Sequence, residues 1–445
     1  MQKGESVNEY NIVIIGGGST WTPGILKSLV MHRSDFPLHR IALYDIDEKR
    51  LAAIGEFGKI LFREEAPDVE FIYTTDKKTA YTGADFAFCQ IRTGGYPMRE
   101  QDEKIPLDFD VIGQETCGPG GFAYGMRSIK DMLELVQDVR SYSDAWILNY
   151  TNPAAIVAPA LVKALPDEKK VLNICDQPIN LLRSYGRLIN YDCKKFTPRY
   201  FGLNHFGWFT HIFDEHGNDL APKIKAAILS EGFKPVDAEQ RDASWLDTYA
   251  IVKDMLEDFP EYLPNTYLQY YLYPQYKASK MSRTVTRATE VINGREKSVF
   301  EECRRIIQMG SARNANIVHN DAHGDMIVEI ALSMVHNRMD TYVVIVPNNG
   351  IIENVPKDAM VEVAASLGAN GPSPYTVGEI GSFYKGLIEN QYAFESLTVQ
   401  AFFEQSYSKA LAALTLNRTV VDAKKARKIL DALIEANKGY WPELR

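Results

Sequence analysis

The feature that most constrains the fold is a short apolar run that ends abruptly in glycines. Residues 11–15 (Asn-Ile-Val-Ile-Ile) are typical of a buried parallel strand, and the glycines of 16–18 follow directly. Pro23 and the apolar positions within 25–30 then predict a helix whose N-cap is Thr22. A strand, a glycine loop and a helix in this order indicate a site where the backbone approaches a pyrophosphate, whose charge the helix N-terminus stabilises.

An acidic residue completes the pattern of a dinucleotide site. The next apolar run, 41–44, ends at Asp45, where a carboxylate accepts hydrogen bonds from an adenosine ribose and favours NAD over its 2'-phosphorylated relative. Trp21 replaces the third glycine of the G-x-G-x-x-G pattern, but the flanking strand and acid still favour NAD binding over a structural turn. The predicted cofactor contacts are Gly16, Gly17, Gly18, Ser19, Thr20 and Asp45.

Strands and helices are expected to alternate through the first half of the chain. The further strand candidates are 69–74, 85–91, 145–148 and 171–174. This alternation predicts a mainly parallel, doubly wound sheet. Farther on, strands such as 341–346 and amphipathic helices such as 421–438 predict a second α/β unit. We therefore expect a Rossmann-type NAD-binding domain over 1–200 and an α/β (α+β) domain for catalysis, substrate binding and oligomerisation over 201–445.

Composition excludes several classes of protein. A net charge of -9 argues against a general nucleic-acid binder, which needs an excess of Lys and Arg. The N-terminus lacks the pattern of a signal peptide, and no segment is apolar for long enough to span a bilayer. The five cysteines are widely spaced, as is typical of reduced thiols in a cytosol. We expect a cytoplasmic enzyme that meets a small anionic substrate in a local basic pocket.

Several predicted strands end in polar or reactive residues. These residues are Asp45, Arg92, Asn149, Asn152 and Cys175. Open α/β sheets bind their ligands at the carboxyl ends of the strands, so we expect these residues to border one crevice. Cys175 and the later His205 could each supply one ligand to a divalent metal. Taken alone, each is more often a buried structural residue.

Motifs spread along the chain together resemble glycoside hydrolase family 4. They are GGGSTWTPG, RTGGYPMREQDEKIPL (from Arg92 to Leu107), GQETCGPGGFAYGMRS, NYTNPAA, NICDQP, GLNHFGW, LPNTYLQYY and TRATEVINGRE, in this order. The resemblance extends from about residue 10 to the C-terminal NKGYWPELR and so covers nearly the whole chain. Within the family, the chain is most similar to the 6-phospho-alpha-glucosidase branch.

This resemblance implies hydrolysis of 6-phosphorylated alpha-glucosides, such as maltose 6'-phosphate, with NAD and a divalent metal, usually manganese. The family reacts by elimination: NAD oxidises C3, the acidified C2 proton is removed, the group at C1 leaves, water adds, and C3 is reduced again. NAD is therefore recycled within each turnover. The implied architecture resembles that of lactate and malate dehydrogenases, and the implied assembly is a homodimer or homotetramer.

The resemblance also assigns roles to residues of this chain. It makes Cys175 and His205 the metal ligands and Tyr267 the base at C2. A tyrosine has an ordinary pKa of about 10, so a neighbouring cation must favour its phenolate. Glu115 matches a group that assists this base, and Asp176 matches the acid that helps the glycosidic oxygen leave.

The substrate contacts that the resemblance implies are Arg99, Arg287 and Asn152. An arginine suits a 6-phosphate because its planar guanidinium donates two parallel hydrogen bonds to phosphate oxygens. Arg92 and Arg283 are further candidates of lower rank, since an arbitrary arginine is most often a solvated surface group.

Several alternatives stay open. Asp176 directly after Cys175 favours alpha-glucosides, but Gln177 replaces the usual Met of this branch and leaves the sugar and aglycone open. A 6-phospho-beta-glucosidase or another glycosidase of the same family is the alternative; a 2-hydroxy-acid dehydrogenase and a non-catalytic NAD-binding regulator are more remote. A Cys/His pair would also accept Fe²⁺, Co²⁺ or Ni²⁺. His319 and His323 have the spacing of a helical metal site, but we favour a structural or cleft-bordering role.

Overall fold

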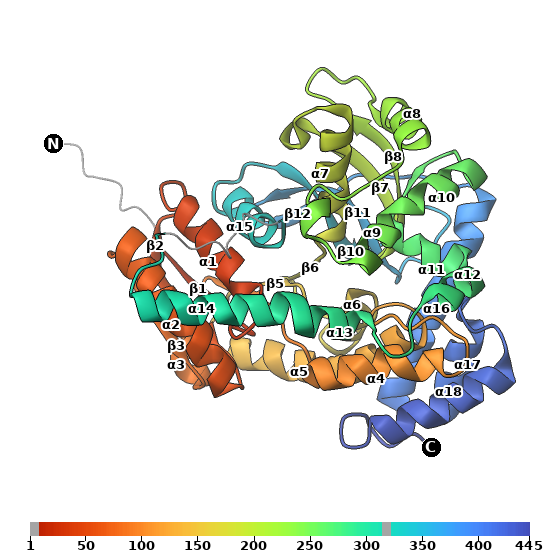
Figure 1. Cartoon of the computed structure of the whole chain (residues 1–445), viewed down its shortest axis with the longest axis horizontal. Helices are drawn as coiled ribbons and strands as arrows, with labels where there is room; N and C mark the ends of the chain where they lie inside the picture. The colour runs from red at the N-terminus through yellow and green to blue at the C-terminus, as the bar shows by residue number, and fades with distance from the viewer. Residues whose placement is uncertain (1–8, 314–321) are drawn as a thin grey trace.

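A computed structural model describes residues 9–313 and 322–445 (Figure 1). Its strands are β1 (Tyr10–Ile15), β2 (Leu38–Tyr44), β3 (Glu70–Thr74), β4 (Phe86–Cys89), β5 (Trp146–Asn149), β6 (Val171–Ile174), β7 (Thr197–Leu203), β8 (Phe206–Phe213), β9 (Leu263–Pro264), β10 (Asp340–Pro347), β11 (Met360–Gly368) and β12 (Gly371–Pro374). Each strand range expected from the sequence contains or overlaps an observed strand. The largest differences are at β2, which begins three residues before the expected 41–44, and at β4, which is shorter than the expected 85–91.

Helices form most of the remaining described chain. They are α1 (Thr22–Met31), α2 (Glu48–Glu65), α3 (Lys77–Tyr81), α4 (Gly95–Leu107), α5 (Gly118–Tyr142), α6 (Ala154–Ala164), α7 (Gln177–Ile189), α8 (Ala221–Glu231), α9 (Ala243–Ala250), α10 (Val252–Asp258), α11 (Gln269–Leu272), α12 (Pro274–Lys280), α13 (Arg287–Val291), α14 (Lys297–Met309), α15 (Ala322–Val335), α16 (Ser382–Glu404), α17 (Tyr407–Leu416) and α18 (Ala423–Ala436). In the part of the chain that the structure describes, no helix is both long and apolar enough to cross a membrane.

The N-terminal strands form the expected doubly wound parallel sheet. Their spatial order is β3-β2-β1-β4-β5-β6, and every neighbouring pair is parallel. This is the strand order of dinucleotide-binding folds, in which the chain reverses direction across the sheet between the first and fourth strands. The mixed α/β class and the Rossmann-type sheet expected from the sequence are confirmed.

The sheet continues into the second half of the chain. β10 pairs antiparallel with β6, through Val344 with Ile174 and Ile345 with Asn173, and β11 and β12 extend the same edge to nine strands. A separate antiparallel sheet contains β7, β8 and β9. One sheet therefore includes strands from both sides of residue 200, the predicted domain boundary, and the boundary itself stays a prediction.

Burial explains why β1 is apolar without interruption. Ile12 and Ile14 pack into a hydrophobic cluster on one face of the sheet, whereas Val13 and Ile15 pack into a second cluster on the other face. Successive strand residues point to opposite faces, so a strand covered by helices on both sides needs an apolar side chain at every position. Each such burial contributes about 1.5–3 kcal/mol.

The start of α1 differs by one residue from the expectation. Trp21 is the N-cap and makes no side-chain capping hydrogen bond, whereas Thr22 is the first helical residue. The Thr22 hydroxyl is buried and accepts a hydrogen bond of 2.9 Å from Gln90 Nε2. Thr22 therefore ties the glycine loop to the segment after β4, and the prediction that it caps the helix was wrong.

Candidate functional site

A cavity of about 1430 Å³ lies at the carboxyl ends of the parallel strands. Its walls include residues that directly follow β1, β2, β4, β5 and β6, together with residues from 241–296. The predicted site residues that line it are Gly16, Ser19, Asp45, Arg99, Glu115, Asn152, Cys175, Asp176, His205, Tyr267 and Arg287. Gly17, Gly18 and Thr20 belong to the same loop but do not line the cavity.

The glycine loop packs so closely against its neighbours that side chains on Gly16 or Gly18 would collide with them. Gly16 has a left-handed φ of +84°, and a Cβ atom on it would lie 2.7 Å from the carbonyl oxygen of Gln90. A Cβ on Gly18 would lie 2.8 Å from the Cβ of Arg50. The glycines therefore let the β1–α1 turn pack between the ends of neighbouring strands and α2.

Asp45 holds this loop from the end of β2. Its Oδ2 accepts a hydrogen bond of 2.8 Å from the Gly18 amide, and its Oδ1 accepts one of 3.0 Å from the Asp47 amide. Next to it, Ile46 lines the cavity and is 87% exposed, which offers apolar surface to a flat ring. Sequence reasoning missed Ile46, although an isolated apolar residue between two acids is a usable signal.

The predicted metal ligands lie together. Cys175 follows β6, His205 lies in the turn between β7 and β8, and the Cys175 Sγ atom is 3.3 Å from the His205 Nε2 atom. Both side chains are buried and line the cavity. Burial lowers the pKa of His205 to about 4, so the neutral imidazole has a lone pair for a cation.

This pair fits a catalytic metal site. Burial raises the pKa of Cys175 well above its ordinary value, so the thiolate form needs a cation beside it. Among the described residues, no group of three or more His, Cys, Asp and Glu side chains could hold a metal ion. A metal held by Cys175 and His205 would therefore keep positions open for substrate and water, as catalytic sites require.

Tyr267 lies against the predicted metal ligand. It sits in a short 3-10 turn (Thr266–Leu268), and its ring stacks on the His205 ring with centroids 4.1 Å apart and planes 8° apart. Asn265 fixes the turn, because its Oδ1 accepts a hydrogen bond of 3.0 Å from the Tyr267 amide. Burial raises the pKa of Tyr267 well above 10, so its phenolate depends on an added positive charge nearby.

Asp176 follows Cys175 at the start of α7. Its Oδ2 is 3.2 Å from the Nδ1 atom of His323, whose ring lies between the rings of Trp21 and Tyr150. Burial acts to raise the pKa of Asp176, but the hydrogen bond and charge of His323, together with the charges of Arg241 and His205, outweigh it, and the pKa lies below 3.8. His323 thus borders the cleft and has no role in the Cys175 and His205 pair. His319 lies outside the described residues.

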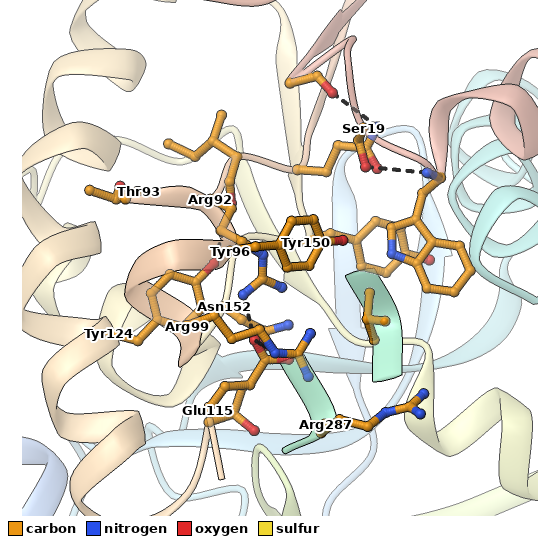
Figure 2. Close-up of a pocket in the computed structure, with 18 of the residues that line it drawn as sticks. Ser19, Arg92, Thr93, Tyr96, Arg99, Glu115, Tyr124, Tyr150, Asn152 and Arg287 are labelled. Carbon is orange, nitrogen blue, oxygen red and sulfur yellow. Dashed lines mark hydrogen bonds and ion pairs between the residues drawn. The ribbon is translucent and has the colours of Figure 1, made fainter. Parts of the chain in front are cut away.

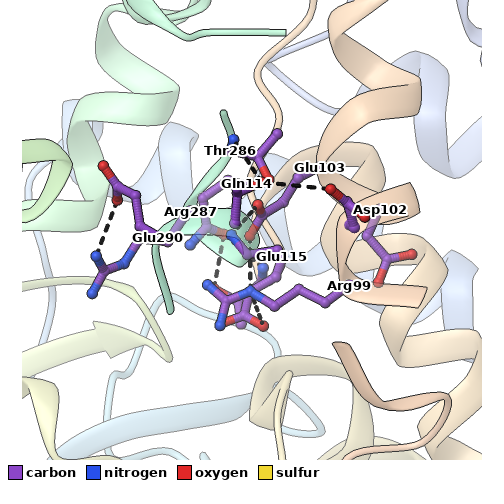
Figure 3. A network of polar contacts seen from close by, with 12 residues as sticks. Arg99, Asp102, Glu103, Gln114, Glu115, Thr286, Arg287 and Glu290 are labelled. Carbon is purple, nitrogen blue, oxygen red and sulfur yellow. Dashed lines mark hydrogen bonds and ion pairs between the residues drawn. The ribbon is translucent and has the colours of Figure 1, made fainter. Parts of the chain in front are cut away.

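Glu115 belongs to a network of arginines (Figures 2 and 3). Its carboxylate pairs with Arg92 and, at 3.2 Å, with the Nε atom of Arg99, which also donates a hydrogen bond of 2.8 Å to Glu103. Burial acts to raise the pKa of Glu115, but these two arginines lower it to about 2. The negative charge of Glu115 raises the pKa of Tyr267 and does not by itself favour the phenolate.

The predicted phosphate and sugar contacts come from different elements. Arg99 lies in α4, Asn152 follows β5, and Arg287 begins α13, where it pairs with Asp242 and, at 3.1 Å, with Glu290. Figure 2 shows these three residues around the same pocket. Among the lower-ranked candidates, Arg92 lines the cavity, whereas Arg283 does not and pairs with Asp110 on the surface.

Sequence reasoning missed Arg295. Its guanidinium lies 4.0 Å from the centroid of the Trp21 ring, and its buried Nε atom has no hydrogen-bond partner among the described residues. It lines the cavity and lies close enough to Arg99 and Arg287 for their charges to lower its pKa, although burial is the largest cause. A signal was present, because Arg295 lies within the motif TRATEVINGRE, from which only Arg287 was nominated.

Family models for two parts of one enzyme family match the chain. Residues 11–189 match the model described as family 4 glycosyl hydrolase, and residues 200–420 match the one described as family 4 glycosyl hydrolase C-terminal domain. The chain is also 47% identical to the maltose-6'-phosphate glucosidase MalH of Clostridium acetobutylicum over 442 residues. That alignment covers 98% of this chain and 100% of the relative.

Two solved structures share the whole architecture. A 6-phospho-alpha-glucosidase from gut microorganisms, in complex with NAD and Mn²⁺, has 55% sequence identity and a TM-score of 0.97. A second 6-phospho-alpha-glucosidase from gut microorganisms, in complex with NAD and glucose 6-phosphate, has 42% identity and a TM-score of 0.94. Each comparison covers 98% of this chain and 100% of the other.

Proposed function

Because the chain belongs to family 4 of the glycosyl hydrolases, we propose that it hydrolyses 6-phosphorylated alpha-glucosides, such as maltose 6'-phosphate, to glucose 6-phosphate and an aglycone. One observation carries this function: the Cys175 and His205 pair adjoins Tyr267 and Asp176 in the cavity that also holds the dinucleotide loop. The beta-glucosidase and dehydrogenase alternatives are not favoured, because the similar enzymes above are all alpha-type hydrolases.

The cofactors are NAD and a divalent cation, Mn²⁺ in the similar structure. The residues that would hold NAD are the glycine loop with Ser19 and Thr20, and Asp45 at the ribose. Cys175 and His205 would hold the cation. When bound, NAD supplies reversible oxidation at C3 of the sugar, and the cation supplies positive charge beside its O2 and O3.

The chain's own side chains would move the protons. Tyr267 would take the proton from C2, and its stacking on His205 places the ring beside the predicted cation site, where a phenolate is stabilised. Asp176 would give a proton to the glycosidic oxygen as it leaves. Because the pKa of Asp176 is low, its carboxyl must receive that proton during the cycle.

The basic wall of the cavity would select the phosphate. Arg99 and Arg287 would donate hydrogen bonds to phosphate oxygens, and Asn152 would contact the sugar. Both arginines have carboxylate neighbours, Glu115 for Arg99 and Asp242 for Arg287, which hold the guanidinium groups in place. Glu115 would assist by holding Arg92 and Arg99 in place and not through its own charge, which raises the pKa of Tyr267.

Hydrolysis of 4-nitrophenyl alpha-glucoside 6-phosphate tests the activity. We expect release of 4-nitrophenol that requires Mn²⁺ and catalytic amounts of NAD, with no net formation of NADH. The beta anomer and the unphosphorylated glucoside serve as controls. Oxidation of a malate-like acid with stoichiometric NADH, and no hydrolysis, would support the dehydrogenase instead.

The route through C2 has its own test. In deuterated water, glucose 6-phosphate released from the substrate should carry solvent deuterium at C2, because the removed proton exchanges before protonation. Retention of protium at C2 through complete turnover would remove Tyr267 from its proposed role. NMR of the isolated product measures the deuterium content.

We also place the enzyme in the cytoplasm as a homodimer or homotetramer. All five cysteines lie in the described residues and none forms a disulfide, which suits a reducing compartment. Light scattering of the purified protein tests the assembly. A monomer at micromolar concentration would contradict it.

A further inference from the structure

His323 stands out among the cavity residues that have no assigned role. It lies in the first turn of α15, is only 7% exposed, and faces the site from outside the parallel strands. Burial of an imidazole costs free energy unless its nitrogens are hydrogen-bonded, so the partners of His323 are informative.

Both nitrogens of the ring face acceptors from opposite parts of the site. Nδ1 is 3.2 Å from Asp176 Oδ2, and Nε2 is 3.2 Å from Gln90 Oε1. The Gln90 amide is oriented by its other end, because Nε2 donates a hydrogen bond of 2.9 Å to the Thr22 hydroxyl. His323 therefore connects Asp176 to the base of the dinucleotide loop.

Both faces of the ring are also held. The Tyr150 ring stacks on one face with centroids 4.0 Å apart, and the Trp21 ring lies parallel at 4.8 Å. The Tyr150 hydroxyl donates a hydrogen bond of 3.1 Å to the carbonyl oxygen of His323, which fixes the backbone as well. Stacking and hydrogen bonding together leave the imidazole a single orientation.

Asp176, in contrast, has few constraints of its own. It is the N-cap of α7, but its side chain makes no capping hydrogen bond. Its side chain is 28% exposed, toward the cavity, and among the described residues only His323 is hydrogen-bonded to its carboxylate. Without His323 the carboxylate would be free to rotate toward water or toward the guanidinium of Arg241, whose charge already acts on it.

We propose that His323 is the positioning residue of the leaving-group acid: it holds Asp176 Oδ2 so that the carboxyl is presented to the glycosidic oxygen in one orientation. This inference rests on the proposed function, because it assigns an orientation to the residue that assists the leaving group. It gives His323 a role in the reaction in place of the purely structural or bordering role that its sequence context favours.

The step that His323 serves is cleavage of the C1–O bond. The bond's electron pair stays on the glycosidic oxygen, which takes a proton from Asp176. The electrons left at C2 after loss of its proton form the C1–C2 double bond. A poor leaving group, such as the sugar alcohol of maltose 6'-phosphate, needs that proton, whereas 4-nitrophenolate leaves without it.

Three variants separate positioning from packing. His323→Phe keeps a ring between Tyr150 and Trp21 but removes both hydrogen bonds. His323→Asn keeps a donor at the position of Nδ1, next to Asp176, whereas His323→Gln keeps one near the position of Nε2, next to Gln90. His336→Asn, at an exposed position just after α15, is the matched control.

The readout is the ratio of kcat/KM for maltose 6'-phosphate to that for 4-nitrophenyl alpha-glucoside 6-phosphate. We expect His323→Phe and His323→Gln to lower this ratio about 10- to 100-fold, because a misoriented acid slows only the poor leaving group. His323→Asn should restore most of the ratio. His336→Asn should leave both rates unchanged.

Isotope exchange gives a second readout that a packing defect would not change. In deuterated water, unreacted maltose 6'-phosphate recovered from His323→Phe should carry more deuterium at C2 than substrate recovered from the unmodified enzyme. When departure of the leaving group is slowed, the C2 carbanion returns to substrate and takes up solvent deuterium. Affinity for NAD and the thermal midpoint report on any damage to the neighbouring loop.

The outcomes are distinct. An equal loss on both substrates, with no extra deuterium in recovered substrate, would overturn the positioning role. A higher kcat/KM ratio in His323→Gln than in His323→Asn would also overturn it. This comparison stays informative even if His323→Phe does not fold. Failure of the unmodified enzyme to hydrolyse either substrate would instead contradict the proposed function.

Discussion

At the level of single residues, the reactive groups of this chain are held by neighbours that are themselves polar and buried. Asn204, which precedes His205, donates a hydrogen bond of 2.9 Å to Glu362 of β11. The His205 backbone has a left-handed φ of +61°, so the ligand sits at the tip of a tight turn. These contacts hold the backbone that carries His205, and the stacked Tyr267 ring orients its imidazole.

Removal of one predicted ligand tests the metal pair directly. We expect His205→Asn to weaken Mn²⁺ binding more than about tenfold, because removal of supporting groups alone costs about 10- to 100-fold. NAD affinity should change little, since the dinucleotide loop lies on other elements. Isothermal titration with Mn²⁺ and NAD separately measures both. His211→Asn, at an exposed position on β8, is the control. Unchanged Mn²⁺ affinity in His205→Asn would show that His205 is not a metal ligand.

At the level of helices, strands and turns, the connection between β1 and α1 combines backbone strain with close packing. Gly16 needs a left-handed backbone and has no room for a side chain. Gly83 has a similar φ of +70°, but a Cβ atom on it would meet nothing within 4 Å. A non-glycine residue in the left-handed region costs about 1–2 kcal/mol. A side chain at Gly83 would therefore cause backbone strain alone, whereas one at Gly16 would cause strain and a steric clash.

Gly16→Ala should lower the thermal midpoint more than Gly83→Ala and should also weaken NAD binding. Both variants carry the backbone strain, but only the first pushes a methyl group against the Gln90 carbonyl. Calorimetry and fluorescence titration with NAD measure the two effects. Equal losses of stability, with NAD affinity intact in both, would show that the loop does not depend on this close approach.

Helix α16 carries a buried carboxyl that makes stability depend on pH. Burial raises the pKa of Glu395 from 4.5 to about 8, and Gln391 donates its hydrogen bond of 2.9 Å. The protonated form is favoured on folding, so its contribution is fully present below pH 4.5 and is lost as pH rises toward about 8. Over this window the free energy of unfolding falls by about 1.4 kcal/mol per pH unit because of Glu395.

Glu395→Gln should remove that loss of stability, because a neutral amide replaces the carboxyl. The stability advantage of the variant should grow from about pH 4.5 to about pH 8 and then stay constant. Urea denaturation across this range measures it. Glu389→Gln, at an exposed position on the same helix, should show no such trend. A pH-independent difference for Glu395→Gln would contradict the raised pKa.

At the level of the entire chain, the large sheet joins segments far apart in the sequence (Figure 1). β6 has β5 on one side and β10 on the other, so both of its edges are covered. Ile345 of β10 and Met360 of β11 also pack against Ala154 and Ala158 of α6. The two halves thus share a core as well as hydrogen bonds, which makes them one structural unit around the cavity.

A fragment that ends before β7 tests this dependence. Residues 9–196 would contain the six parallel strands but would expose the β6 edge that β10 covers, with the apolar surface of α6 beside it. Unpaired apolar edges drive aggregation, so we expect oligomers or precipitate where the full chain stays dispersed. Sedimentation velocity measures the size distribution. A folded, monomeric fragment that binds NAD would instead support a separable N-terminal domain.

Features that depend on neighbours along the chain could be predicted from the amino-acid sequence. Alternate residues of 11–15 are buried on opposite faces, so the apolar run predicted β1, and the glycines and Asp45 predicted the dinucleotide loop. Motif order predicted the family and nominated Cys175 and His205. The prediction of β1 succeeds because strand burial leaves a local pattern, whereas the metal role of Cys175 and His205 stays a prediction.

Contacts between distant side chains, in contrast, could be seen only once the chain was folded. Cys175 and His205 are 30 positions apart, Asp176 and His323 are 147 apart, and Arg295 reaches Trp21 from the opposite half of the chain. Such contacts depend on strand order and on how α15 and the π-helical segment Ile292–Glu296 pack against the elements around the cavity. Spacing in the sequence carries no record of that packing, which is why the His323 contact with the proposed acid emerged only from the fold.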